Sequence, residues 1–104
     1  MQSLVITEKD QPTIFCDVDD TLILWSRCVD GCPAVNGPLC ARLEAAKAVG
    51  YCIWLWSFGG PAHAKAAAVY CGITDIVDGY CWKPSIVIDD NHAWLDRRLE
   101  RQAP

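Results

Sequence analysis

The stretch that decides the fold is TIFCDVDDT, at residues 13–21. It begins with the apolar run Thr13 to Cys16 and then becomes acidic within one residue. A short apolar run bounded by polar residues is typical of a buried strand in a parallel sheet. Similar runs follow at 51–56 and 85–88, with helical patterns between them. Strands that alternate with helices predict an α/β fold, here a three-layer α/β/α sandwich whose parallel, Rossmann-like sheet has the first strand at its centre.

Glycine and proline mark where the helices begin and end. Asn36-Gly37-Pro38 fits a helix start, because asparagine is a good N-cap and proline suits the first turn, and Gly50 ends this helix. A second helix is expected from Gly59-Gly60-Pro61 to Gly72. A last helix is expected to be capped by Asn91 and to carry Trp94, Leu95 and Leu99.

The segments between these elements are harder to assign. Leu22 to Pro33 is irregular and contains Gly31, so we expect a loop or a small hairpin flap. Ile76-Val77 is expected to form a third short strand, and Ser85 to Ile88 a buried strand that ends at Asp89.

Bulk properties restrict the class of protein. A length of 104 residues suits one domain spanning 1–104, and a net charge of −4 argues against a broad nucleic-acid-binding surface. The apolar run at 51–56 is far shorter than the roughly 20 residues of a membrane-spanning helix, and the N-terminus lacks the basic start of a signal peptide. We therefore expect no membrane association and a cytoplasmic location. The seven cysteines are expected to pack as small apolar residues, since Cys28 and Cys32 lack the further paired ligands of a zinc motif.

Polar residues follow the predicted strands where each strand ends. They are Asp17 and Asp19 after the first strand, Ser57 after the second, and Asp89 and Asp90 after the last. Ligands of open α/β sheets bind at the carboxyl ends of the strands, so these side chains are expected to converge in one crevice. Carboxylates held close together repel one another unless a cation lies between them, and oxygen ligands of this kind suit Mg²⁺.

Such a constellation suits phosphoryl transfer. Asp17 can act as the nucleophile, and Asp19 can protonate the leaving oxygen and later deprotonate water. Ser57, together with the backbone N–H groups of Phe58 and Gly59 at a helix N-terminus, can hold a phosphate. Lys83 is expected to bring positive charge to both the phosphate and Asp17. Turn formation, helix capping and solvation remain the alternative roles for these residues.

The same residues resemble the four motifs of the haloacid dehalogenase (HAD) superfamily. Residues 17–21 are similar to its Asp-x-Asp-x-Thr motif, Ser57 to its second motif, Lys83-Pro84 to its third, and 86–90 to its fourth, in family order. The resemblance implies a phosphoric monoester hydrolase with Mg²⁺ held by Asp17, the Asp19 carbonyl and an acid of the fourth motif. Of the two acids there, Asp89 is favoured as the direct ligand, with Asp90 binding through water or pairing with Lys83.

The chain departs from the usual family pattern in having no room for a cap domain. About 35 residues separate Thr21 from Ser57 and about 25 separate Ser57 from Lys83, whereas a small domain needs roughly 50. An uncapped site implies an open-site substrate such as a nucleotide, a nucleic-acid end or a phosphoprotein. In the flap, Arg27 is a candidate phosphate-binding residue, and Trp25 either packs in the flap or contacts the substrate.

Two other classes of function use similar residues. A receiver-like phospho-acceptor also has acids, a Ser or Thr and a Lys around Mg²⁺, but it places its acid pair before its nucleophile, the reverse of the order here. The other class is a non-catalytic phosphate- or metal-binding module, against which the presence of Asp17, Asp19 and Lys83 argues. His63 and His92 are expected to be surface or helix-start residues rather than ligands.

Overall fold

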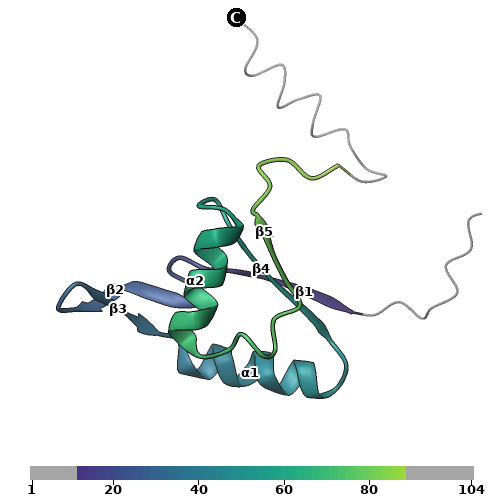
Figure 1. Cartoon of the computed structure of the whole chain (residues 1–104), viewed down its shortest axis with the longest axis horizontal. Coiled ribbons are helices and arrows are strands. Elements are labelled where there is room, and N and C mark those ends of the chain that lie inside the picture. Colours follow the sequence, from purple (N-terminus) through teal and green to yellow (C-terminus); the bar gives the residue numbers. More distant parts are fainter. Residues whose placement is uncertain (1–11, 89–104) are drawn as a thin grey trace, which may run out of the picture.

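Three parallel strands form the centre of the fold in the computed structural model, which describes residues 12–88 (Figure 1). They are β1 (Thr13–Asp17), β4 (Cys52–Ser57) and β5 (Gly79–Trp82), and their order in the sheet is β1-β4-β5. The prediction of a small α/β fold with a parallel sheet is confirmed. The first strand was expected at the centre, but among the described residues β4 is central and β1 lies at an edge.

Both helices pack against the same face of this sheet. Helix α1 (Gly37–Ala48) connects β1 to β4, and α2 (Pro61–Cys71) connects β4 to β5. Two right-handed crossovers that step in the same direction across a sheet place both helices on one side. The core between them contains Leu43 of α1, Ala64, Ala67 and Ala68 of α2, and Ile53 and Leu55 of β4. The small alanine side chains allow α2 to lie close to the strands.

The opposite face of the sheet carries aromatic side chains. Phe15 stacks on Trp56 with 4.8 Å between ring centroids, and 47% of Phe15 remains exposed. Residues 12–88 therefore form two layers, and a helix layer over this aromatic face is not among them. The predicted last helix, with Asn91 and Trp94, lies outside the described residues.

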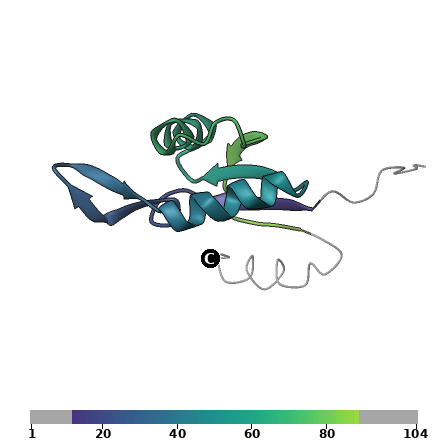
Figure 2. The same ribbon diagram turned by 90° about the horizontal axis from the view of Figure 1, so that it is seen from below.

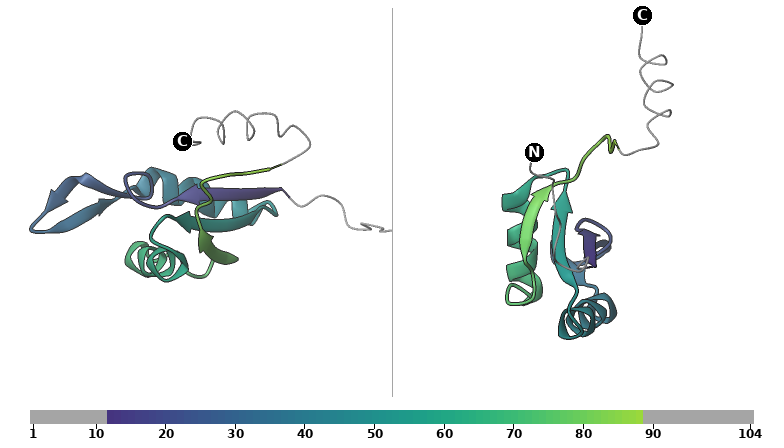
Figure 3. Two further views of the ribbon diagram at one scale, coloured as in Figure 1. Left: turned by 90° about the horizontal axis from the view of Figure 1, so that it is seen from above. Right: turned by 90° about the vertical axis from the view of Figure 1, so that its right-hand side faces the viewer.

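The predicted flap is a β-hairpin of β2 (Ile23–Val29) and β3 (Cys32–Val35). Asp30 and Gly31 connect the strands with φ angles of 54° and 79°, the left-handed pair that a two-residue hairpin turn requires. Figure 2 shows the hairpin extending beyond the sheet as an arm, and the left view of Figure 3 shows the same arm from the opposite side. The arm begins beside the acidic loop that follows β1.

Two of the predicted strands are wrong. Ile76 and Val77 lie in a turn and the irregular stretch after it, and the third strand begins at Gly79 instead. The reason lies in Asp78, whose backbone N–H donates to the Ile53 carbonyl at 2.7 Å and whose side chain accepts the Ile53 N–H at 2.7 Å. These contacts bring the chain alongside β4 only after Val77.

The segment from Ser85 to Ile88 is also not a strand. Val87 is 55% exposed and Ile88 is 61% exposed, so the run is not buried either. Pro84 offers no N–H to a strand ladder, and no described strand pairs with the residues beyond it. Apolar composition alone did not distinguish this run from a buried strand.

None of the helices in residues 12–88 has the length and apolarity that crossing a membrane requires.

Candidate active site

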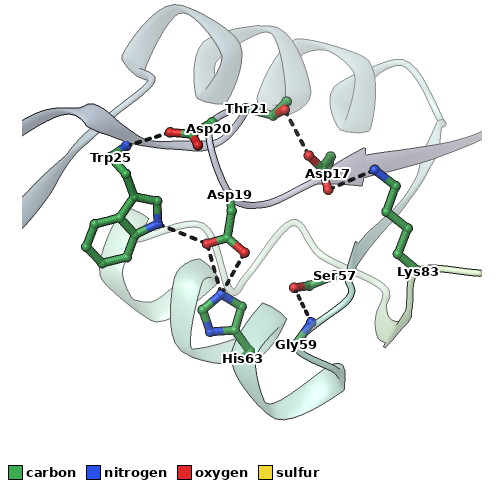
Figure 4. A network of polar contacts seen from close by, with 9 residues as sticks. All are labelled: Asp17, Asp19, Asp20, Thr21, Trp25, Ser57, Gly59, His63 and Lys83. Carbon is green, nitrogen blue, oxygen red and sulfur yellow. Dashed lines mark hydrogen bonds and ion pairs between the residues drawn. The ribbon is translucent and has the colours of Figure 1, made fainter.

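Three predicted site residues lie at the carboxyl ends of the three adjacent parallel strands. Asp17 is the last residue of β1, Ser57 is the last of β4, and Lys83 follows β5 directly. The strand register brings them to the same level, because Asp17 pairs with Trp56 and Ser57 pairs with Trp82. The sheet therefore brings together Asp17, Ser57 and Lys83 at the carboxyl ends of its strands, with Asp19 in the loop that follows β1 (Figure 4).

The Asp17 carboxylate has a partner on each oxygen. Lys83 Nζ lies 3.4 Å from Asp17 Oδ1, and the Thr21 hydroxyl donates to Oδ2 at 3.1 Å. The side chains of Asp17 and Lys83 are 33% and 31% exposed, so a ligand can reach both. Lys83 Nζ also lies 5.1 Å from the centroid of the Phe58 ring. The ammonium group is thus held between a carboxylate and an aromatic face.

The loop after β1 is held by its own backbone. Val18 is fully buried, and its carbonyl accepts hydrogen bonds from the N–H groups of Thr21, Leu22 and Ile23. Asp20 adopts a left-handed conformation with φ of 59°, which is uncommon outside glycine but enriched for aspartate. The tight turn brings Asp17 and Asp19 to the same end of the sheet.

The Asp19 carboxylate receives donors from two separate elements. Trp25 Nε1, in β2, donates to Oδ1 at 3.0 Å, and His63 Nε2, in α2, lies 3.0 Å from Oδ1 and 3.1 Å from Oδ2. Partial burial raises the pKa of Asp19, but the hydrogen bonds from Trp25 and His63, and the charge of His63, outweigh it and lower the pKa below its usual value. Asp19 is therefore ionised at neutral pH.

Ser57 is almost entirely buried, at 1% exposure, and begins the turn into α2. Its Oγ accepts a hydrogen bond from the Gly59 N–H at 2.9 Å. Gly60 caps α2 with a φ of 96° and provides no side chain for the cap. The N-terminus of α2 thus lies beside Ser57, where the helix dipole favours an anion. In this structure the Gly59 N–H is bonded to Ser57, and it must exchange that bond in order to hold a phosphate.

Arg27, a further predicted site residue, is not part of this cluster. Arg27 lies on the exposed part of β2, and among residues 12–88 no hydrogen bond or ion pair joins it to the residues of the cluster. Asp89 and Asp90, the predicted metal ligands of the last motif, lie outside the described residues.

Two groups among the described residues have the chemistry of the expected magnesium ligands. The Asp17 carboxylate and the Asp19 carbonyl are oxygen donors of the kind that Mg²⁺ prefers. Within residues 12–88 no group of three His, Cys, Asp or Glu side chains is arranged to hold a metal ion. Asp89 and Asp90, the acids expected to complete the ligand set, lie outside the described residues.

His63 is the contact that the sequence interpretation missed. It was assigned to the surface or to the start of a helix, and it does lie in the first turn of α2, but its ring meets Asp19. Its position six residues after Ser57 is the one available signal, because the first turn of a helix that begins at a site lies near that site. The bond from Trp25 to Asp19 was likewise not foreseen.

No protein-family model, curated protein or solved structure matches this chain, so its function is inferred from its own residues and their geometry.

Proposed function

We propose that this chain is a magnesium-dependent phosphatase that hydrolyses a phosphate monoester through an aspartyl-phosphate, in the manner of the HAD superfamily. The observation that carries the proposal is the convergence of Asp17, Ser57 and Lys83 at the ends of three adjacent strands, with Asp19 beside them. A nucleophile, an acid–base group, a hydroxyl and a cation in one place are the parts that phosphoryl transfer needs.

In the first step an Asp17 carboxylate oxygen attacks phosphorus, an oxygen–phosphorus bond forms, and the bond from phosphorus to the leaving oxygen breaks. Lys83, 3.4 Å from Asp17, offsets the negative charge that the phosphate brings. The proton for the leaving oxygen comes from Asp19. Asp19 is ionised when the site is empty, so it must first take up a proton, from the monoanionic phosphate of the substrate or from water, as the added negative charge of the phosphate favours the protonated carboxyl.

In the second step water attacks the phosphorus of the aspartyl-phosphate, and the Asp17–phosphorus bond breaks. Ionised Asp19 takes the proton from this water. The hydrogen bonds from Trp25 and His63 favour the ionised form of Asp19 that this step needs. We expect the start of α2 and the Ser57 hydroxyl, which is buried in this structure, to hold the phosphate oxygens once the Gly59 N–H exchanges its bond with Ser57. Bound Mg²⁺ would add positive charge at the phosphate, with Asp17 and the Asp19 carbonyl among its ligands.

The surroundings of the site favour a substrate that extends into solvent. Among the described residues the β2–β3 hairpin is the one insertion between the acidic loop and α1, and it is too small to enclose a ligand. Trp25, at its base, is 44% exposed beside Asp19. A nucleotide, a nucleic-acid end or a phosphoprotein fits such an open site better than a small sugar phosphate that needs enclosure.

The second candidate is a non-catalytic module that binds phosphate or a receiver-like phospho-acceptor. It shares the Asp17–Lys83 pair but needs no acid–base group. The two donors on Asp19 favour the hydrolase, because a binding module has no use for a carboxylate held in this way.

Turnover of an aryl phosphate, with Mg²⁺ or with chelator, tests the proposal. Wild-type protein should show Mg²⁺-dependent release of phosphate and a hydroxylamine-sensitive acyl phosphate on Asp17. Asp17→Asn should lower turnover at least about a thousandfold. Asp30→Asn, at the exposed tip of the hairpin, is the matched control and should behave as wild type. Phosphorylation of Asp17 without turnover would indicate the phospho-acceptor instead, and neither signal would indicate a binding module.

A further inference from the structure

The contact between His63 and Asp19 joins two parts of the chain that are 44 positions apart. His63 belongs to the first turn of α2, and its Nε2 lies within 3.1 Å of both oxygens of the Asp19 carboxylate. The two side chains are 38% and 45% exposed. At such exposure an ion pair contributes little to folding, so stability alone does not account for the arrangement.

Trp25, in strand β2, supplies a second hydrogen-bond donor to the Asp19 carboxylate. An indole N–H can only donate, so this 3.0 Å bond requires Asp19 to be the acceptor. The backbone N–H of Trp25 in turn donates to Asp20 Oδ1 at 3.0 Å, which holds the base of the side chain. Asp19 is thus held between β2 and α2, as Figure 4 shows.

His63 also lies close to the turn that follows Ser57. A Cβ placed on Gly59 would lie 3.1 Å from the His63 ring, so the absence of a side chain at Gly59 leaves room for the imidazole. The N–H of this same glycine is bonded to Ser57 Oγ. The His63 ring therefore contacts the carboxylate of Asp19 and lies beside the turn next to the candidate phosphate-binding hydroxyl.

We propose that His63, together with Trp25, is a positioning residue that holds the Asp19 carboxylate toward the leaving oxygen of the substrate. The proposal rests on the proposed phosphatase function and names the residues that fix the position of the side chain used in its acid–base step. Without these donors a 45% exposed carboxylate in a loop would sample several rotamers, and proton transfer depends on a position within hydrogen-bond reach. His63 acts through Asp19 and does not itself touch the reacting atoms.

Leaving-group dependence separates this role from a structural one. His63→Ala should lower kcat for an alkyl phosphate, whose leaving oxygen is basic, by about tenfold or more, and for an aryl phosphate by less than about threefold. KM should stay unchanged, and His63→Gln, which keeps a terminal N–H donor, should restore most of the loss. Lys65→Ala, on the exposed side of the same helix, is the control and should match wild type.

A double-mutant cycle then tests whether His63 works through Asp19. In the Asp19→Asn background, His63→Ala should have almost no further effect on the alkyl phosphate, because the group that it positions has lost its function. Additive losses, or equal losses on both substrates with a lowered Tm, would overturn the positioning role while leaving the phosphatase intact. Wild-type protein without Asp17-dependent turnover would instead overturn the phosphatase proposal, and the positioning role with it.

Discussion

Lys83 Nζ lies 3.4 Å from Asp17 Oδ1, although Asp17 ends β1 and Lys83 follows β5, two strands that are not neighbours in the sheet. Lys83 extends from the end of β5 across the end of β4 to reach the end of β1. Its backbone N–H donates to the Ser57 carbonyl at 2.9 Å, which holds the start of this side chain next to the central strand. The ammonium is therefore placed by the sheet and not by a flexible loop.

Replacement of Lys83 should impair catalysis far more than stability. Lys83→Met removes the charge but keeps an unbranched side chain that can lie on Phe58, and we expect kcat/KM to fall about 10²–10³-fold. A partly exposed ion pair contributes only about 0–1 kcal/mol to folding, so Tm should change little. Kinetics and thermal unfolding of Lys83→Met and of the control Lys65→Met measure both effects. A large loss of Tm with unchanged kcat/KM would assign Lys83 to stability alone.

Gly79 is required by the aromatic face of the sheet. A Cβ at this position would lie 2.4 Å from the Trp54 ring, so Gly79→Ala must displace a rigid indole that lies across β5. We expect a loss of about 1–3 kcal/mol in the free energy of unfolding, as for other overpacked sites. Gly37→Ala is the matched control, because a Cβ there meets nothing within 4 Å. Denaturant titration of both variants checks the difference, and equal stabilities would show that Trp54 moves aside at no cost.

Asp78 should make stability depend on pH. The hydrogen bond from Lys47, at 2.6 Å, and the one from the Ile53 N–H lower the pKa of Asp78 below its usual 3.8. A depressed pKa in the folded state means that the stabilisation is present above the unfolded-state pKa and is lost as pH falls through the folded-state value. Asp78→Asn should thus reduce the free energy of unfolding by about 1 kcal/mol at pH 7, with the difference vanishing in strong acid.

Denaturant unfolding of wild type and Asp78→Asn at several pH values between neutral and acid measures the pH range over which the difference in stability disappears. Asp75→Asn, an exposed neighbour on the same loop, is the control and should leave the pH profile unchanged. A difference between wild type and Asp78→Asn that stays constant with pH would show that shape, and not charge, matters at this position.

The elements that the sequence predicted well are those with strong local signals. Asn36 Oδ1 accepts the Leu39 N–H at 3.2 Å as a helix cap should, and Gly72 ends α2 in a left-handed conformation with φ of 71°. Both features depend only on residues nearby in the chain, so composition and spacing suffice to find them.

The elements that the sequence did not predict depend on contacts between distant residues. Asp78 and Gly79 look like turn residues, yet they open β5 because Asp78 binds the backbone of Ile53 and Gly79 makes room for Trp54. The meeting of Asp19 with His63 has the same cause, because the position of α2 over the sheet brings them together. Asp17, Ser57 and Lys83 were predicted to converge because strand ends in a parallel sheet share an edge.

The final prediction concerns recognition by the hairpin. Trp25 is 44% exposed with its indole N–H bound to Asp19, and Arg27 lies two residues further along β2, in the same irregular part of the hairpin. A base beside a terminal phosphate could stack on Trp25, which is worth roughly 1–3 kcal/mol, while Arg27 binds a neighbouring phosphate. Arg27→Ala and Trp25→Leu should therefore raise KM for a nucleotide substrate about tenfold or more and change KM for a minimal aryl phosphate much less.

Trp25→Phe separates the two roles of the indole, because it keeps an aromatic face but removes the N–H: KM should stay near wild type while kcat on alkyl phosphates falls. Ser26→Ala, between the two residues, is the control. A large fall in Tm with unchanged KM in Trp25→Leu would mean that the indole only packs the base of the hairpin.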